Sequence, residues 1–83
     1  MTKTQAKSKI LKLLDQLRDI REELSDLAYE TRETADEIEP YEDKDDLTPQ
    51  QEERQEWFSY VADTLETQSD NLDDIITEIE YLE

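Results

Sequence analysis

The sequence predicts an all-α protein: a single domain over residues 1–83, folded as an antiparallel two-helix hairpin of the coiled-coil kind. Three observations carry this prediction. The chain has no glycine and only two prolines, so few residues interrupt a helix. Apolar residues recur with a seven-residue period in two stretches, which is a helical pattern and not a strand alternation. A short acidic segment that contains Pro40 and ends before Pro49 separates the two stretches.

The first helix is expected over about residues 5–39. With Ile10 taken as position a of a heptad, position a holds Ile10, Leu17, Leu24, Thr31 and Ile38, and position d holds Leu13, Ile20, Leu27, Thr34 and Tyr41. Eight of these ten residues are apolar, so positions a and d together predict one continuous seam. The helix should end at Glu39, because the residue before a proline is pushed out of the helical region.

The second helix is expected over about residues 49–82, after a loop at 40–48. Thr48 is a favoured N-cap, Pro49 suits the first helical position, and Gln51 completes a capping box. A second seam follows, with Phe58, Leu65, Leu72 and Ile79 at position a and Val61, Gln68, Ile75 and Leu82 at position d. A short loop between helices of similar length favours antiparallel packing.

The antiparallel register follows from matching side-chain size and charge across the two helices. If the numbers of paired residues sum to about 89, the bulky Trp57, Phe58 and Val61 lie opposite small residues of the first helix. These small residues are Ala28, Thr31, Thr34 and Ala35. The same register brings the basic start of the first helix beside acids of the second, namely Asp73, Asp74, Glu78 and Glu80. Exposed ion pairs contribute about 0.2–1 kcal/mol each, so they bias the orientation more than they stabilise it.

Near the open end of the hairpin, the apolar stripe is wider than a two-helix seam requires. The residues expected to bind a further helix there are Ile10, Leu11, Leu14, Ile76, Ile79 and Leu82. Because two helices cannot enclose a core, the sequence predicts self-association, most simply a homodimer that forms a four-helix bundle. Burial against a foreign partner is the alternative. Gln68 is either a selector of register and oligomeric state or a side chain that reaches solvent.

The charge of the chain is large, negative and unevenly placed. The chain has 25 acidic and nine basic side chains, a formal charge of -16. Residues 1–21 carry six basic and two acidic side chains, a net of +4, and residues 22–83 carry three basic and 23 acidic ones, a net of -20. Such a surface attracts basic protein surfaces and repels nucleic acid and anionic membranes. The expected partner is therefore a basic protein.

These residues do not assemble a catalytic site. Without histidine and cysteine, the chain lacks the commonest general base near neutral pH, the usual triads and any thiolate ligand. Without glycine it lacks a phosphate-binding loop, and the acidic residues 42–46 lack the alternating acids and central glycine of a calcium loop. We therefore expect a non-enzymatic protein with no metal or other cofactor. We also expect no signal peptide and no membrane span, because no apolar run is long enough.

The densest acidic segment surrounds the predicted loop. Residues 30–56 hold twelve acids and three basic residues, a net of -9. The acids, which we call the acidic tip, are Glu30, Glu33, Asp36, Glu37, Glu39, Glu42, Asp43, Asp45, Asp46, Glu52, Glu53 and Glu56. All but Glu39 are candidate partner-binding residues.

Helical spacing would arrange these acids in rows. Acids three or four residues apart lie about 5–6 Å from each other on a helix, a separation comparable to that of phosphates along a DNA strand. Two antiparallel rows, extended by Glu22, Glu23 and Asp26, would fit a groove lined by Lys and Arg. The alternative interpretation is a solvated helix surface that serves solubility.

Aromatic residues lie beside the acids in the sequence. Trp57, Tyr60 and Tyr29 are candidate anchors for a basic partner, through packing and cation–π contacts. The alternative for Trp57 is that it fills the space left by the small residues of the first helix.

Three segments carry a resemblance that extends over most of the chain: L-x-x-I-R-E-E-L at 17–24, the acidic turn with its prolines, and L-D-D-I-I-T-E-I at 72–79. Together they resemble small acidic helical-hairpin proteins of bacteriophages and mobile elements of Gram-positive bacteria. Some small acidic phage proteins inhibit host defence, among them DNA-mimicking anti-restriction and anti-CRISPR proteins. The resemblance thus implies a cytoplasmic inhibitor that occupies the basic groove of a nucleic-acid-binding nuclease. The alternative is a structural or adaptor protein that acts through coiled-coil self-association and its apolar open end.

Overall fold

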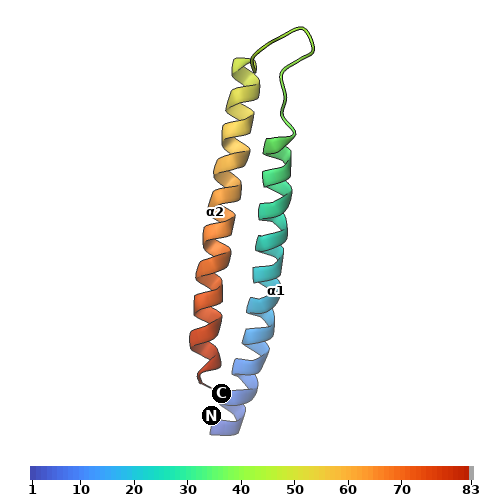
Figure 1. Cartoon of the computed structure of the whole chain (residues 1–83). Coiled ribbons are helices and arrows are strands. Elements are labelled where there is room, and N and C mark those ends of the chain that lie inside the picture. Colours follow the sequence, from blue (N-terminus) through green and yellow to red (C-terminus); the bar gives the residue numbers. More distant parts are fainter. Residues whose placement is uncertain (83) are drawn as a thin grey trace.

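The structure is a computed structural model that describes residues 1–82, within which it has two helices and no strand. Helix α1 spans Lys3–Asp36 and helix α2 spans Pro49–Glu80, which ends two residues before the expected position. The helices run antiparallel and pack against each other, joined by the loop at 37–48 (Figure 1). The prediction of an all-α helical hairpin is therefore confirmed. Its Cα atoms fill a rod of 69 × 15 × 14 Å.

Both helices begin at a capping box. The Oγ1 of Thr2 accepts from the N–H of Gln5 at 3.1 Å, and the N–H of Thr2 donates to the Gln5 side chain at 2.9 Å. Thr48 and Gln51 make the same pair of bonds at α2, at 3.2 and 2.9 Å, and Pro49 follows the cap. A threonine cap is worth about 1 kcal/mol of helix stability. The box at Thr48 matches the sequence prediction, and the box at Thr2 starts α1 two residues earlier than expected.

Helix α1 ends at Asp36, three residues before the expected end. Glu37 is its C-cap, and the N–H of Ile38 donates to the oxygen of Ala35 at 3.3 Å in a tightened last turn. Pro40 has no N–H to offer the carbonyl of Asp36. The last turn also contains no basic residue. The negative end of the helix dipole therefore repels the acids of this turn, and no positive side chain offsets that repulsion. Both effects shorten the helix.

The core is a narrow line of residues in the middle of the helix contact. Most of the buried residues recur every seven or fourteen positions: Leu14, Ala28 and Ala35 on α1, and Ala62, Ser69 and Ile76 on α2. In the predicted heptads all six occupy position e. Leu14 and Ile76, which the sequence assigned to self-association, are at most 1% exposed and belong to this core of the hairpin itself.

The register agrees with the sequence prediction. Ala28 and Ala62, both at most 2% exposed, have residue numbers that sum to 90. The Nε2 of Gln55 donates to the backbone oxygen of Ala35 at 3.2 Å, and these numbers also sum to 90. The ion pairs, which long arginine side chains make, join residues whose numbers sum to 94 to 98, so the predicted sum of 89 holds approximately.

The sequence predicted that the residues at positions a and d lie inside the contact between the helices. This prediction is wrong for the residues at position d. The a residues lie beside the core and are half-buried, with Thr31 buried. In contrast, Leu13, Ile20, Leu27 and Ile75 at position d are 46 to 47% exposed. The contact is centred between a and e, which turns position d toward solvent.

Short side chains explain this rotation. Ala28, Ala35, Ala62 and Ser69 at position e let the two backbones approach closely along that line. No space remains for Trp57, which is 59% exposed and packs its ring edge-on against Phe58, with the ring centroids 5.0 Å apart. The expectation that Trp57 fills a gap beside α1 is therefore wrong.

Ion pairs lie on the side of the contact away from the exposed d residues. Arg18 pairs with Glu80 at 3.2 Å, and Arg21 pairs with Asp73 at 2.7 Å. These two pairs confirm that the basic start of α1 meets acids of α2. Further along, Arg32 pairs with both Asp63 and Glu66, and these hydrogen bonds raise its pKa. The arginine therefore stays charged and bound across the contact.

Candidate partner-binding surfaces

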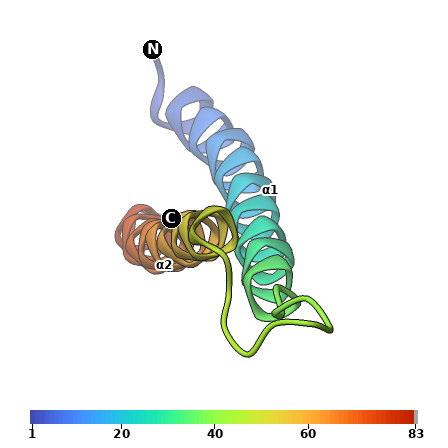
Figure 2. The same cartoon turned by 90° about the horizontal axis from the view of Figure 1, so that it is seen from above.

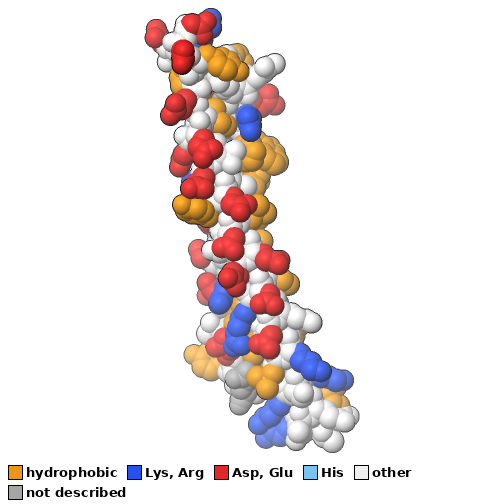
Figure 3. Space-filling model, turned by 90° about the vertical axis from the view of Figure 1, so that its right-hand side faces the viewer, with side chains coloured by type: hydrophobic (Ala, Val, Ile, Leu, Met, Phe, Trp, Pro, Cys, Tyr) orange, Lys and Arg blue, Asp and Glu red, His pale blue; other side chains and the backbone are white. Residues whose placement is uncertain are grey.

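The acidic tip occupies the loop end of the rod. Its acids come from the last turns of α1, the loop and the first turns of α2, and all twelve are exposed. Figure 3 shows acidic side chains around this end and along the face of the rod turned to the viewer. The structure therefore brings together the residues that the sequence singled out, as one solvent-facing anionic end.

The three basic residues of this segment do not neutralise the tip. Arg32 is committed to Asp63 and Glu66 below it, and the guanidinium of Arg54 lies over the Phe58 ring, 5.5 Å from the centroid. The remaining cation is Lys44, in the loop, and its backbone N–H closes a turn with the oxygen of Tyr41 at 2.9 Å. Among residues 1–82, no acid of the tip forms an ion pair. Its charge thus faces solvent.

Exposed aromatic rings border the tip. Tyr29 and Tyr60 are 65% and 71% exposed. The pKa of the Tyr29 phenol is raised, first by a hydrogen bond to Glu33 and then by the charge of that carboxylate. A hollow of about 290 Å³ lies against the indole of Trp57 and is lined also by Gln50, Glu53 and Arg54. Sequence reasoning proposed Trp57 as an anchor but did not locate this hollow beside it.

A second surface is apolar and runs along the side of the rod opposite the ion pairs. Because the helices are antiparallel, position d lies on the same side of the contact in both of them. We call this surface the apolar strip, and it consists of the d residues Leu13, Ile20, Leu27, Val61 and Ile75, with the polar Gln68 between the last two. Apolar side chains follow the right-hand margin of the rod in Figure 3. Sequence reasoning missed its extent, because it placed these residues inside the hairpin.

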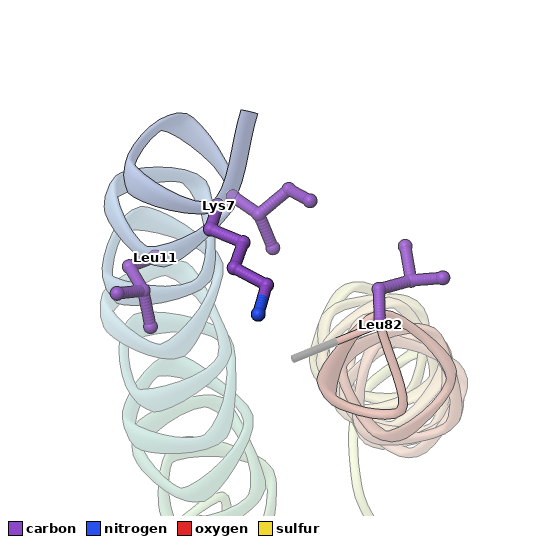
Figure 4. Close-up of a pocket in the computed structure, with 4 residues that line it drawn as sticks. Lys7, Leu11 and Leu82 are labelled. Atoms are coloured by element: carbon purple, nitrogen blue, oxygen red, sulfur yellow. The ribbon is translucent and has the colours of Figure 1, made fainter. Parts of the chain in front are cut away.

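The open end differs from the predicted apolar end. The first turns of α1 diverge from α2 there, as the view along the rod shows (Figure 2). A cavity of about 210 Å³ lies in this fork, lined by Lys7, Ile10, Leu11 and Leu82 (Figure 4). Of the predicted self-association residues, Leu11 is 50% exposed here, and Ile10 and Ile79 are half-buried. The exposed apolar area therefore extends along the strip as well as over this end.

Two further features bear on function. Within residues 1–82, no group of three or more acids is arranged to hold a metal ion. Neither described helix contains a segment both apolar and long enough to cross a bilayer.

Comparisons with protein-family models, curated proteins and solved structures found no match to this chain. The functional interpretation therefore depends on the geometry and charge of the two surfaces.

Proposed function

We propose that this protein is a non-enzymatic inhibitor that inserts its acidic tip into the basic, nucleic-acid-binding groove of another protein, as a mimic of DNA or RNA. The observation that supports the proposal is the unpaired state of the tip: twelve exposed acids, and no ion pair to any of them within residues 1–82. A surface that only needed solubility could intersperse its charges, as the rod does next to the tip, where Arg32 pairs with Asp63 and Glu66.

The shape of the tip suits a groove. Two antiparallel helices carry the acids in rows, with neighbours three or four residues apart about 5–6 Å from each other. The rod measures 15 × 14 Å across its Cα atoms, and each helix with its side chains is about 10–12 Å wide, so the end suits a groove that accommodates a nucleic-acid duplex. Lysine and arginine side chains in such a groove would pair with carboxylates in place of phosphates.

Electrostatics also predicts how this binding would behave. Opposite charges steer the two proteins together and raise the association rate, and salt weakens that attraction. The exposed rings of Tyr29, Tyr60 and Trp57 would add packing and cation–π contacts with arginine, which persist at higher salt.

Charge reversal tests the proposal. Changing Glu30, Glu33, Glu37, Asp45 and Asp46 to Lys should abolish capture of basic nucleic-acid-binding proteins from a bacterial lysate. The matched control changes five exposed acids far from the tip to Lys: Asp15, Asp19, Asp70, Asp74 and Glu78. It alters the net charge equally and should keep most of the binding. If both variants lose capture to the same extent, the tip has no special role.

A structural or adaptor role is the second candidate, and the exposed apolar strip favours it. Such a protein would lose its partner when Ile20 and Ile75 become Lys, since both are 47% exposed on the strip. The charge-reversed tip variant would leave that interaction intact. Measuring capture with both variants separates the two functions.

A further inference from the structure

We propose that the apolar strip binds a second copy of the chain, with the two loops at opposite ends, to form an antiparallel four-helix bundle. This inference concerns the side of the rod, whereas the proposed function concerns its tip, and in the dimer each tip would lie beside the open end of the other copy. It rests on four observations: the exposure of the strip, its internal symmetry, the position of Gln68, and the uneven charge along the rod.

The strip carries apolar area that the hairpin leaves uncovered. Leu13, Ile20, Leu27 and Ile75 are each almost half exposed, and they lie on one side of the rod next to the half-buried a residues. Removing the apolar surface of leucine and isoleucine side chains from water contributes about 25 cal/mol of favourable free energy for each Å². A continuous row of this kind is typical of a binding surface on a soluble protein.

The strip is symmetric about its middle. Leu13 and Leu27 are each seven residues from Ile20 on α1, and Val61 and Ile75 are each seven residues from residue 68 on α2. Ile20 and residue 68 lie at the same level, since their numbers sum to 88, close to the register of the hairpin. A two-fold axis through this level would place Leu13 on Leu27 of a second copy and Ile20 on its own equivalent. The strip is therefore complementary to itself.

The polar residue at the middle favours the same arrangement. With the loops at opposite ends, the Gln68 side chains of the two copies meet at the axis, where their amides can hydrogen-bond to each other. With the loops at the same end, Gln68 would face Ile20 of the second copy and its amide would be buried without that partner. Gln68 thus selects the orientation of the two hairpins.

The charge along the rod also discriminates between the two orientations. With the loops at the same end, the two acidic tips meet, and each belongs to a segment of net charge -9. With the loops at opposite ends, each tip lies beside the open end of the other copy, where the +4 of residues 1–21 is offset by five acids in residues 69–82, for a net of -1. Lys9 lies at position g, which flanks the strip, and it faces an acid of the second copy in either arrangement. This acid is Glu30 when the loops lie at opposite ends and Glu78 when they lie at the same end. Lys9 therefore does not distinguish the two arrangements, and the charges of the tips do. Like charges repel, and the arrangement that joins the tips is therefore disfavoured.

The first experiment measures mass in solution at micromolar protein. The unmodified chain should have twice the mass of its 9.9 kDa monomer. Ile20→Lys places a charge on the axis without touching the hairpin core, and it should halve the mass while the helical circular dichroism remains. The control is Leu11→Lys, because Leu11 is similarly exposed on the other flank of α1 and its variant should stay dimeric. A monomeric unmodified protein, or a Leu11→Lys variant that alone dissociates, would overturn the inference.

Disulfide trapping tests the orientation and does not depend on a dissociating variant. The chain has no native cysteine, so Leu13→Cys and Leu27→Cys each introduce a single thiol. When the two variants are mixed and oxidised, a covalent dimer should form between them, since a disulfide needs Cα atoms about 4.4–6.8 Å apart. Each variant alone should stay unlinked. Linkage of Leu27→Cys with Val61→Cys, and not with Leu13→Cys, would show the loops at the same end and contradict the inference.

Discussion

Ala28 and Ala62 are buried in the contact between the helices, where larger side chains would hold the helices apart. Both are at most 2% exposed, whereas Leu27, one position away on α1, is 47% exposed, and Leu65, three positions away on α2, is half-buried. Most of the buried e positions hold alanine or serine, and Leu14 and Ile76 fill the same line toward the open end, so the buried face is not the one with the most large apolar residues. The apolar strip is a direct consequence, because the same close approach turns position d outward.

Ala28→Leu tests this role of small residues. The larger side chain cannot fit the line of closest approach, so we expect a loss of stability of about 1–3 kcal/mol, measured by urea denaturation. Thr67→Leu is the matched control, because Thr67 is exposed on α2 and a leucine there meets solvent. Equal stabilities for the two variants would mean that the helices do not meet at Ala28.

Helix ends are set by local chemistry, and the sequence predicts them well where that chemistry is distinctive. The start of α2 follows from Thr48, Pro49 and Gln51, which are separated by the spacing of a capping box. The end of α1 is less predictable, because Pro40 sets only the latest possible end and the repulsion of acids in the final turn decides the rest.

Thr48→Ala tests the cap of α2. The substitution removes the acceptor of the Gln51 N–H, so the free energy of unfolding should fall by about 1 kcal/mol. Thermal unfolding monitored by circular dichroism measures this. The control is Thr67→Ala, which removes a hydroxyl bonded within the helix to the oxygen of Asp63 and should change stability much less. A Thr48→Ala protein as stable as the control would show that the box is dispensable.

Packing between the helices is the part that sequence patterns describe incompletely. The sequence predicted the register approximately, because the pairing of opposite charges depends on the level of a residue along the rod. It did not predict the rotation of each helix about its own axis. Positions d and e both border position a, and the apolar Leu13, Ile20 and Leu27 favoured d. Position e is the buried one because most of its side chains are short and let the two helices approach closely.

The whole molecule separates two kinds of surface. The acidic tip lies at one end, and the apolar strip lies along one side. A dimer with its loops at opposite ends would carry a tip at each end, far enough apart for two partners to bind. The location of the acids could be predicted from the sequence, because every acid of the tip lies near the bend. The strip could not, because it depends on the rotation of the helices.

Salt should affect the two surfaces in opposite directions. Added salt screens the attraction between the tip and a basic groove and weakens that binding. It also screens the repulsion between two chains of charge -16, so it should strengthen self-association through the strip. Sedimentation of the protein alone and capture of its partner, each followed over a range of salt concentrations, measure the two trends. Parallel trends would contradict the assignment of separate surfaces.

Competition with nucleic acid tests the central claim most directly. The immobilised protein is loaded with a basic protein captured from a bacterial lysate at low salt, and a duplex oligonucleotide is then added in increasing amounts. Because the tip is proposed to occupy the groove that binds nucleic acid, the duplex should displace the captured protein in full. Retention of the captured protein at saturating duplex, with the duplex bound beside it in a ternary complex, would contradict the account.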